Sequence, residues 1–187
     1  MREVHICEHD DEMSILKRLR DLFRKTQLTI ADPLFGKIVY SPRSKQWFAE
    51  NLSLKGKLNE VDQISIVADE SGPDESHREA FSRMLREYDH TIARIEQLLD
   101  EDYRKWCKLV RGELGGGDLT TVKGFPILET SLDVLNHVHF ESIEVSGANK
   151  RRHPRSDVYL YICIGWEEEH NRAAFLEDGK LIDYDVV

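Results

Sequence analysis

A long stripe of apolar residues at helical spacing is the feature that most constrains how this chain folds. The stripe follows Asp74, a residue type that favours the N-cap of a helix, and continues to about Asp100. Its members recur three or four positions apart: Phe81, Met84, Leu85, Tyr88, Ile92, Ile95, Leu98 and Leu99. A coiled coil with a second chain would use a similar stripe, but no matching partner helix accompanies it. We therefore predict one long helix that covers a sheet.

Segments with strand-forming residues precede and follow this helix. Short polar breaks separate the three segments before it, which predicts an antiparallel meander: Phe35 to Ser41, Gln46 to Leu54, and Leu58 to Ala68. The segments predicted as strands after it are His139 to Val145, Val158 to Trp166, Ala173 to Leu176, and Lys180 to Val186. Asp178-Gly179 predicts a hairpin turn between the last two. The predicted fold is α+β: a mainly antiparallel sheet from two strand groups, covered by one long helix plus shorter helices.

The beginning of the chain is predicted to be an appendage within a single domain that spans residues 1–187. Residues 10–27 combine an apolar face at helical spacing with a basic opposite face, which predicts an amphipathic helix. We expect its apolar face to pack on the domain; a membrane or partner surface is the alternative. Because Pro33 disfavours helical geometry at Asp32, we divide the chain there into an N-terminal strand-and-helix appendage (1–31) and a main α+β body (32–187).

Charge and cysteine content restrict the class of protein. The chain carries 26 Lys and Arg against 35 Asp and Glu, a formal net charge of −9. This balance disfavours phosphate-directed nucleic-acid binding by the whole surface and suits a basic protein partner. No run approaches the roughly 18 apolar residues of a membrane helix, and the acidic first residues differ from a signal peptide. The three cysteines (Cys7, Cys107 and Cys163) form no CxxC motif, so we predict a cytoplasmic protein without a disulfide framework.

The most distinctive segment is Trp166-Glu167-Glu168-Glu169-His170. Burying three glutamates together is costly, so we predict that they form an exposed acidic rim beside the Trp166 ring. An aromatic anchor with an acidic rim is a docking surface for a basic protein. Catalysis or metal binding is the alternative, but strand alternation would offer only two of these groups on each face.

This segment also resembles a known type of hairpin. With Asn171 and the Asp178-Gly179 turn that follow, it is similar to the Trp-Asp-Glu-Glu-His-Gly hairpin of uncharacterised bacterial families often found beside toxin–immunity clusters. The stretch from Asp32 to Tyr40 (Asp-Pro-Leu-Phe-Gly-Lys-Ile-Val-Tyr), with Trp47 after it, resembles the opening of the family called domain of unknown function 2262. Asn171 replaces the usual Gly, but Asn tolerates left-handed turns. The resemblance implies no established reaction, so it identifies no catalytic residue.

A weaker candidate for chemistry lies near the beginning of the chain. If His5, Cys7 and His9 are extended, alternation places all three on one face, and a following Asp completes a tetrahedral zinc site. An ordinary edge strand is the alternative interpretation. The basic run at 150–155 is interpreted as a solvated loop, with a phosphate or acidic partner as its alternative, because no aromatic stacking platform accompanies it.

The sequence therefore predicts a non-enzymatic protein-interaction domain, with no cofactor, that binds a basic partner in the manner of an immunity protein. A small metal-dependent enzyme using the His/Cys or the Glu/His cluster is the alternative. A regulatory module that binds nucleic acid through the basic loop is a third hypothesis.

Overall fold

The structure is a computed structural model that describes residues 28–50, 52–123, 125–128, 131–149, 153–167 and 170–187. The predicted amphipathic helix at 10–27 lies outside the described residues, and the division into an appendage and a main body stays a prediction. No helix in the described ranges is both long and apolar enough to cross a membrane.

The strands of the described chain form a single mixed sheet whose spatial order is the sequence order. They are β1 (Thr29–Asp32), β2 (Gly36–Ser41), β3 (Gln46–Ala49), β4 (Gln63–Ile66), β5 (Val138–Val145), β6 (Val158–Ile164), β7 (Arg172–Glu177) and β8 (Lys180–Val186). Every neighbouring pair is antiparallel except β4 and β5, which pair in parallel from Gln63↔Ser142 to Ile66↔Val145. A parallel pair needs a long crossover, and the two helices lie in that connection.

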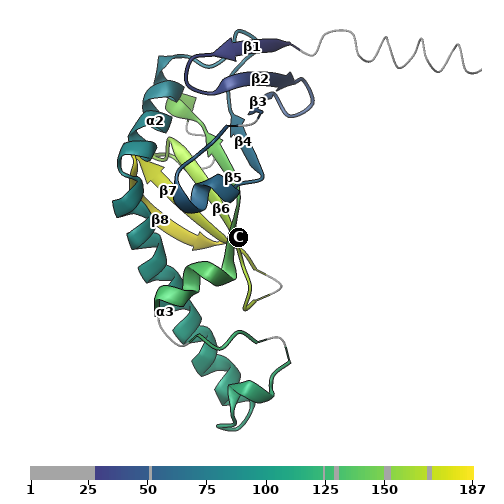
Figure 1. The fold of residues 1–187 in the computed structure, drawn as a ribbon, viewed down its shortest axis with the longest axis vertical. Helices are drawn as coiled ribbons and strands as arrows, with labels where there is room; N and C mark the ends of the chain where they lie inside the picture. Colours follow the sequence, from purple (N-terminus) through teal and green to yellow (C-terminus); the bar gives the residue numbers. More distant parts are fainter. Residues whose placement is uncertain (1–27, 51, 124, 129–130, 150–152, 168–169) are drawn as a thin grey trace, which may run out of the picture.

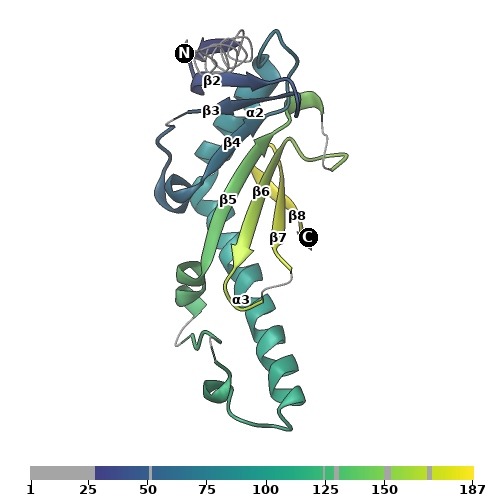
Figure 2. The ribbon, with the colours of Figure 1, turned by 90° about the vertical axis from the view of Figure 1, so that its right-hand side faces the viewer.

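The two α-helices of the described chain follow each other with one residue between them. They are α2 (Glu75–Arg86) and α3 (Tyr88–Glu113), and both run along the same side of the sheet (Figures 1 and 2). Asp74 is the N-cap of α2 and its carboxylate accepts a hydrogen bond from the His77 amide, which confirms the predicted cap. At Glu87 the backbone (φ −85°, ψ 6°) leaves the α-helical region. The hydroxyl of Tyr88 then accepts a hydrogen bond from the Lys57 amide at 2.8 Å, which fixes the start of α3.

The main core lies between the helices and the face of the sheet that they cover. Along β6, the residues at even positions (Val158, Leu160, Ile162 and Ile164) belong to this core, as the period of two requires. The rings of Phe35 and Phe81, 5.0 Å apart, join the β1–β2 turn to α2. Further along the chain, Ile95 and Leu99 of α3 are fully buried. The apolar stripe therefore covers a sheet face.

The predicted fold is wrong in its architecture. The strands do not divide into two groups, because β4 and β5 pair in parallel and join all of them into one continuous sheet. In place of the predicted long helix with shorter helices, the described chain has the two α-helices α2 and α3. The apolar stripe predicted a single helix because its spacing continues across Glu87. The break between α2 and α3 depends instead on the backbone conformation of that residue. The segment predicted as a strand from Leu58 begins instead with the 3-10 helix η1 (Gly56–Glu60). The turn predicted at Asp178-Gly179 is confirmed, with positive φ at both residues.

Candidate functional site

The side of the sheet that faces away from α2 and α3 carries a second, smaller apolar cluster. We call this side the open face, because no helix of the described chain packs on it (Figure 2). Strand alternation directs the odd-numbered residues of β6 onto it, including Tyr159 and Tyr161. Together with Ala173 and Phe175 of β7 and Ile182 of β8 they form a cluster separate from the main core.

The rings of this cluster contact one another in specific geometries. Tyr159 meets Phe175 edge to face with centroids 5.3 Å apart, and Tyr161 lies 6.4 Å from Tyr159. His153 extends the row at 5.1 Å from Phe175. The Tyr161 hydroxyl accepts a hydrogen bond of 2.9 Å from the side-chain amide of Asn171. Tyr159 and Phe175 are each only 9% exposed, so the half-exposed Tyr161 is the ring of the cluster that solvent reaches.

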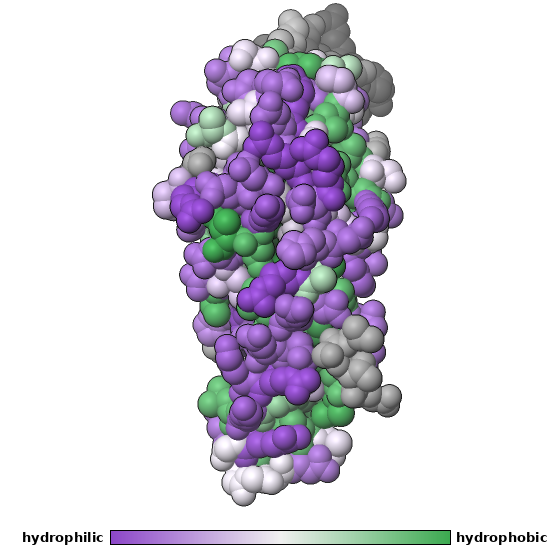
Figure 3. Space-filling view, turned by 90° about the vertical axis from the view of Figure 1, so that its left-hand side faces the viewer, coloured by the Kyte–Doolittle hydropathy of each residue, from purple (hydrophilic) through white to green (hydrophobic). Residues whose placement is uncertain are grey.

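Carboxylates lie beside this aromatic cluster. Asp183 and Asp185 of β8 are exposed and stand directly opposite Phe175 and Ala173 in the register, so they share the open face. On the other side of the cluster, Glu141 is exposed on β5. The outer surface of α2 and α3 is different, because it is mainly hydrophilic with small, scattered apolar patches (Figure 3).

The predicted docking segment has a different geometry from the expected rim. β6 ends at Ile164, so Trp166 lies beyond the strand. The residue is 5% exposed, and its ring packs edge to face on Tyr103 of α3 at 5.5 Å. The Glu167 side chain is only 11% exposed. Glu168 and Glu169 lie outside the described residues. Trp166 and Glu167 are thus internal, and His170 is the exposed residue of the segment within the described part.

Glu167 is internal because Arg172 pairs with it. Arg172 is 4% exposed, and its guanidinium donates to Asp102 of α3 at 2.5 Å and to Glu167 at 2.8 Å. Burial alone would raise the pKa of Glu167, but hydrogen bonds from Arg172 and His170 outweigh it and lower the pKa. Glu167 and Arg172 therefore keep their ionised forms, and the network ties the segment after β6 to α3.

One acid–base pair faces solvent at the end of this network. The Nδ1 atom of His170 lies 2.6 Å from a Glu167 carboxylate oxygen, and the His170 ring is half-exposed. Such a pair can hold a histidine in one tautomer, as a general base requires. No group of three or more His, Cys, Asp and Glu suited to a metal ion occurs in the described part. The pair remains the best candidate for the enzymatic alternative.

A cluster that the sequence did not reveal lies elsewhere on the open face. Cys163 and His139 are direct cross-strand partners; the thiol contacts Glu141 at 2.9 Å, and His139 lies 2.8 Å from Asp62. Burial, reinforced by Glu141, raises the pKa of the Cys163 thiol to about 12. The thiol stays protonated at neutral pH and is a poor nucleophile. Asp62 comes near His139 through the parallel β4–β5 pairing, which no local sequence signal predicts.

Two other predicted features lie wholly or partly outside the described residues. His5, Cys7 and His9 fall in the segment 1–27, so the zinc site stays a prediction. Residues 150–152 of the basic run are likewise not described. The described end of that run, Arg155, forms an ion pair with Glu177 at 2.6 Å.

Comparison with known proteins identifies a family but no activity. A family model described as a domain of unknown function (DUF6985) matches residues 34–185. No curated protein and no solved structure matches the chain. The expectation of an uncharacterised domain is confirmed, while the resemblance to domain of unknown function 2262 and to the hairpin families stays a prediction.

Proposed function

The chain belongs to the DUF6985 family, and from that premise we propose that it is a non-enzymatic, cytoplasmic interaction domain whose open face binds a basic protein. One observation carries the proposal: on a sheet face that no described helix covers, the half-exposed ring of Tyr161 is supported by the buried rings of Tyr159 and Phe175. Aromatic side chains are enriched at the centres of protein interfaces, where they bury large area with little loss of side-chain freedom.

The charge beside the cluster selects the partner. Asp183, Asp185 and Glu141 are exposed around the aromatic rings, and the whole chain has a formal net charge of −9. An acidic surface accelerates association with a basic protein and repels acidic ones. The partner that fits the open face is therefore a folded protein with a basic patch that surrounds an apolar pocket.

Among basic partners we propose a toxin, so that the chain acts as an immunity-type protein. The resemblance of the Trp166–Asn171 segment to hairpins of families found beside toxin–immunity clusters supports this choice, as does the acidic balance. In this role the open face covers the basic active surface of the toxin.

The test uses the purified basic product of a neighbouring gene as the partner and calorimetry as the measurement. Tyr161→Ser removes the half-exposed ring of the cluster and is expected to weaken binding about tenfold or more, as loss of an interfacial aromatic anchor does. The matched control is Leu109→Ser, which removes an exposed apolar side chain from α3 and should leave the affinity unchanged. The affinity should fall as salt is added, because salt screens the attraction between the acidic face and the basic partner.

Two results would contradict the proposal. If both variants bind like the parent chain, the open face is not the interface. If protein purified without a histidine tag retains stoichiometric metal that Cys7→Ser releases, and turnover accompanies the metal, the enzymatic alternative is correct.

A further inference from the structure

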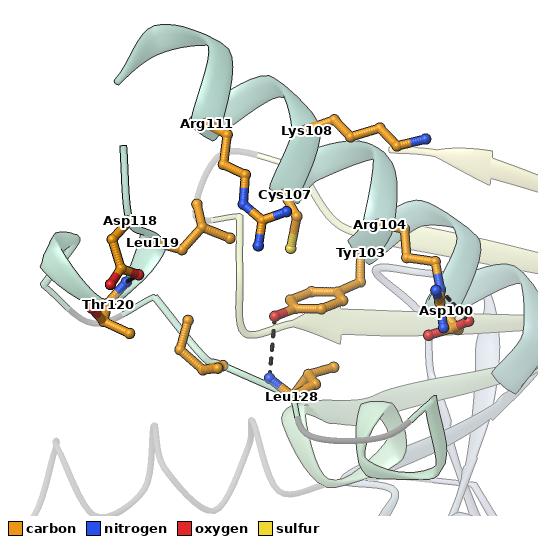
Figure 4. A pocket seen from close by; sticks show the side chains of 11 residues that line it. Asp100, Tyr103, Arg104, Cys107, Lys108, Arg111, Asp118, Leu119, Thr120 and Leu128 are labelled. Atoms are coloured by element: carbon orange, nitrogen blue, oxygen red, sulfur yellow. Dashed lines mark hydrogen bonds and ion pairs between the residues drawn. The ribbon is translucent and has the colours of Figure 1, made fainter. Parts of the chain in front are cut away.

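A pocket of about 470 Å³ opens beside the C-terminal half of α3 (Figure 4). We call it the α3 pocket. One wall is the helix from Asp100 to Arg111, and the other is formed by Asp118 to Thr120 together with Ile127 and Leu128. Its volume lies within the range of about 300–1,000 Å³ typical of small-molecule sites.

Hydrogen bonds hold the two walls together. The Tyr103 hydroxyl donates to the Pro126 carbonyl at 2.8 Å and accepts from the Leu128 amide at 3.2 Å. Cys107 and Leu119 are buried between the walls. The Asp118 carboxylate accepts from the Thr120 amide at 2.9 Å and caps the short 3-10 helix η2 (Leu119–Thr121). The pocket is thus formed before any ligand arrives.

Three cations of α3 line the same pocket in a chain that is acidic overall. Arg104, Lys108 and Arg111 are spaced four and three residues apart, so they follow one side of the helix. Arg104 already forms an ion pair of 2.8 Å with Asp100. Within the described part, Lys108 and Arg111 have no ion pair. The Arg111 side chain lies between Leu119 and Cys107, above the Tyr103 ring (Figure 4).

Two carboxylates, Asp100 and Asp118, and Thr120 also line the pocket, and the rest of the lining is largely apolar. Ile127 is 50% exposed, which is unusual for an isoleucine, and Leu128 lies beside it on the same wall. Leu119 completes this side next to Arg111. The pocket therefore offers the Arg111 guanidinium, whose charge also acts on Asp118, on one side and aliphatic side chains on the other.

From this juxtaposition we propose that the α3 pocket binds a small organic anion. Its carboxylate or phosphate group pairs with Arg111, whose planar donors fit either oxyanion, and Lys108 adds charge at the rim. The apolar part of the ligand covers Leu119, Ile127 and Leu128. This site is separate from the open face and goes beyond the proposed function, because its ligand is a small molecule rather than a protein.

The experiment titrates the full chain with phenyl phosphate, benzoate, inorganic phosphate and the neutral benzyl alcohol while amide NMR signals are recorded. We expect saturable shifts at Leu119, Thr120 and Leu128 with phenyl phosphate or benzoate. Whichever of the two binds tighter identifies the anionic group. Inorganic phosphate should bind about tenfold more weakly than phenyl phosphate, because it leaves the apolar wall uncovered, and benzyl alcohol should not saturate.

Two variants and one control test whether the organic anions bind in the α3 pocket. Arg111→Gln should weaken the binding of both organic anions about tenfold or more, as loss of a charged hydrogen-bond partner does. Arg86→Gln removes another exposed charge, from α2, and should leave their binding unchanged. Ile127→Gln should weaken phenyl phosphate and leave inorganic phosphate unchanged. The proposal is overturned by equal effects of the two arginine variants, by equal affinities for phenyl and inorganic phosphate, or by unsaturable shifts spread over the surface.

Discussion

Asp74 ties the start of α2 to a buried histidine. Its carboxylate accepts from the amide of His77 at 3.2 Å and contacts the His77 ring at 2.6 Å, while the other ring nitrogen lies 2.9 Å from the Val67 carbonyl. Asp74→Ala removes this cap and should lower the free energy of unfolding by about 0.5–2 kcal/mol, measured by urea denaturation. Asp74→Asn keeps a capping oxygen, so its free energy of unfolding should fall less than that of Asp74→Ala. Equal stability of all three proteins would mean that the cap contributes nothing.

The same residue gives the protein a defined acid sensitivity. A hydrogen bond from the Ser76 hydroxyl, followed by those from His77, lowers the pKa of Asp74 from its usual 3.8 to about 2. A carboxyl whose pKa is lower in the folded state stabilises it above the unfolded pKa, and this contribution is lost as the pH falls from about 4 towards 2. In urea unfolding over this pH range, the parent should lose more stability than Asp74→Asn, and parallel curves would contradict the expectation.

Local residue signals were sufficient for some features and not for others. The Asp74 cap and the Asp178-Gly179 turn were predictable because each depends on residues adjacent in sequence. The pairing of Arg172 with Asp102 was not predictable, because α3 brings in a carboxylate 70 positions away. Without that ion pair, the sequence predicted that Glu167 lies at an exposed rim. In the structure Arg172 donates to the Glu167 carboxylate, which makes the burial of this charge favourable.

At the scale of elements, β8 lies at an edge of the sheet and has a built-in protection. Asn171 and Val187 exchange both backbone hydrogen bonds, so alternation directs the amides of Tyr184 and Val186 outward. Each of these amides donates to the carboxylate of the preceding residue, Asp183 at 2.9 Å and Asp185 at 2.8 Å. The two carboxylates thus occupy donors that another strand would otherwise use.

Removing these carboxylates should expose the edge to self-association. The double variant Asp183→Ala, Asp185→Ala frees both outward amides and lowers the local negative charge, so sedimentation velocity should detect dimers or larger species. Asp89→Ala with Glu101→Ala removes the same charge from exposed positions of α3 and should stay like the parent chain. If both double variants sediment alike, net charge rather than edge protection controls association.

The strands could be predicted from the sequence, but their pairing into one sheet could not. The strand segments around Ile38, Ile143 and Leu160 were found because β-branched and alternating residues indicate strands locally. Their assembly into one sheet depends on β4 and β5 meeting in parallel after both helices have intervened. The hydrophobic pattern of each strand is compatible with either an antiparallel or a parallel neighbour, so the pattern alone gave two strand groups. The α3 pocket was missed for a related reason, because its walls meet only after the chain reverses beyond α3.

For the whole molecule, this connection predicts that the sheet unfolds as one unit. One core cluster contains Trp47 and Ile66 from the strands before the helices and Ile143 and Leu160 from those after them, with Phe81 of α2 between. Amide hydrogen exchange measured at increasing urea should therefore give β3 and β6 the same opening free energy and the same urea dependence. The amides of Thr121 and Val122, in the exposed segment beyond α3, serve as an internal reference and should open locally with a small urea dependence. If the amides of β1 to β4 open at a lower free energy than those of β5 to β8, the parallel junction does not couple the two halves. The chain would then contain two cooperative units despite its continuous sheet.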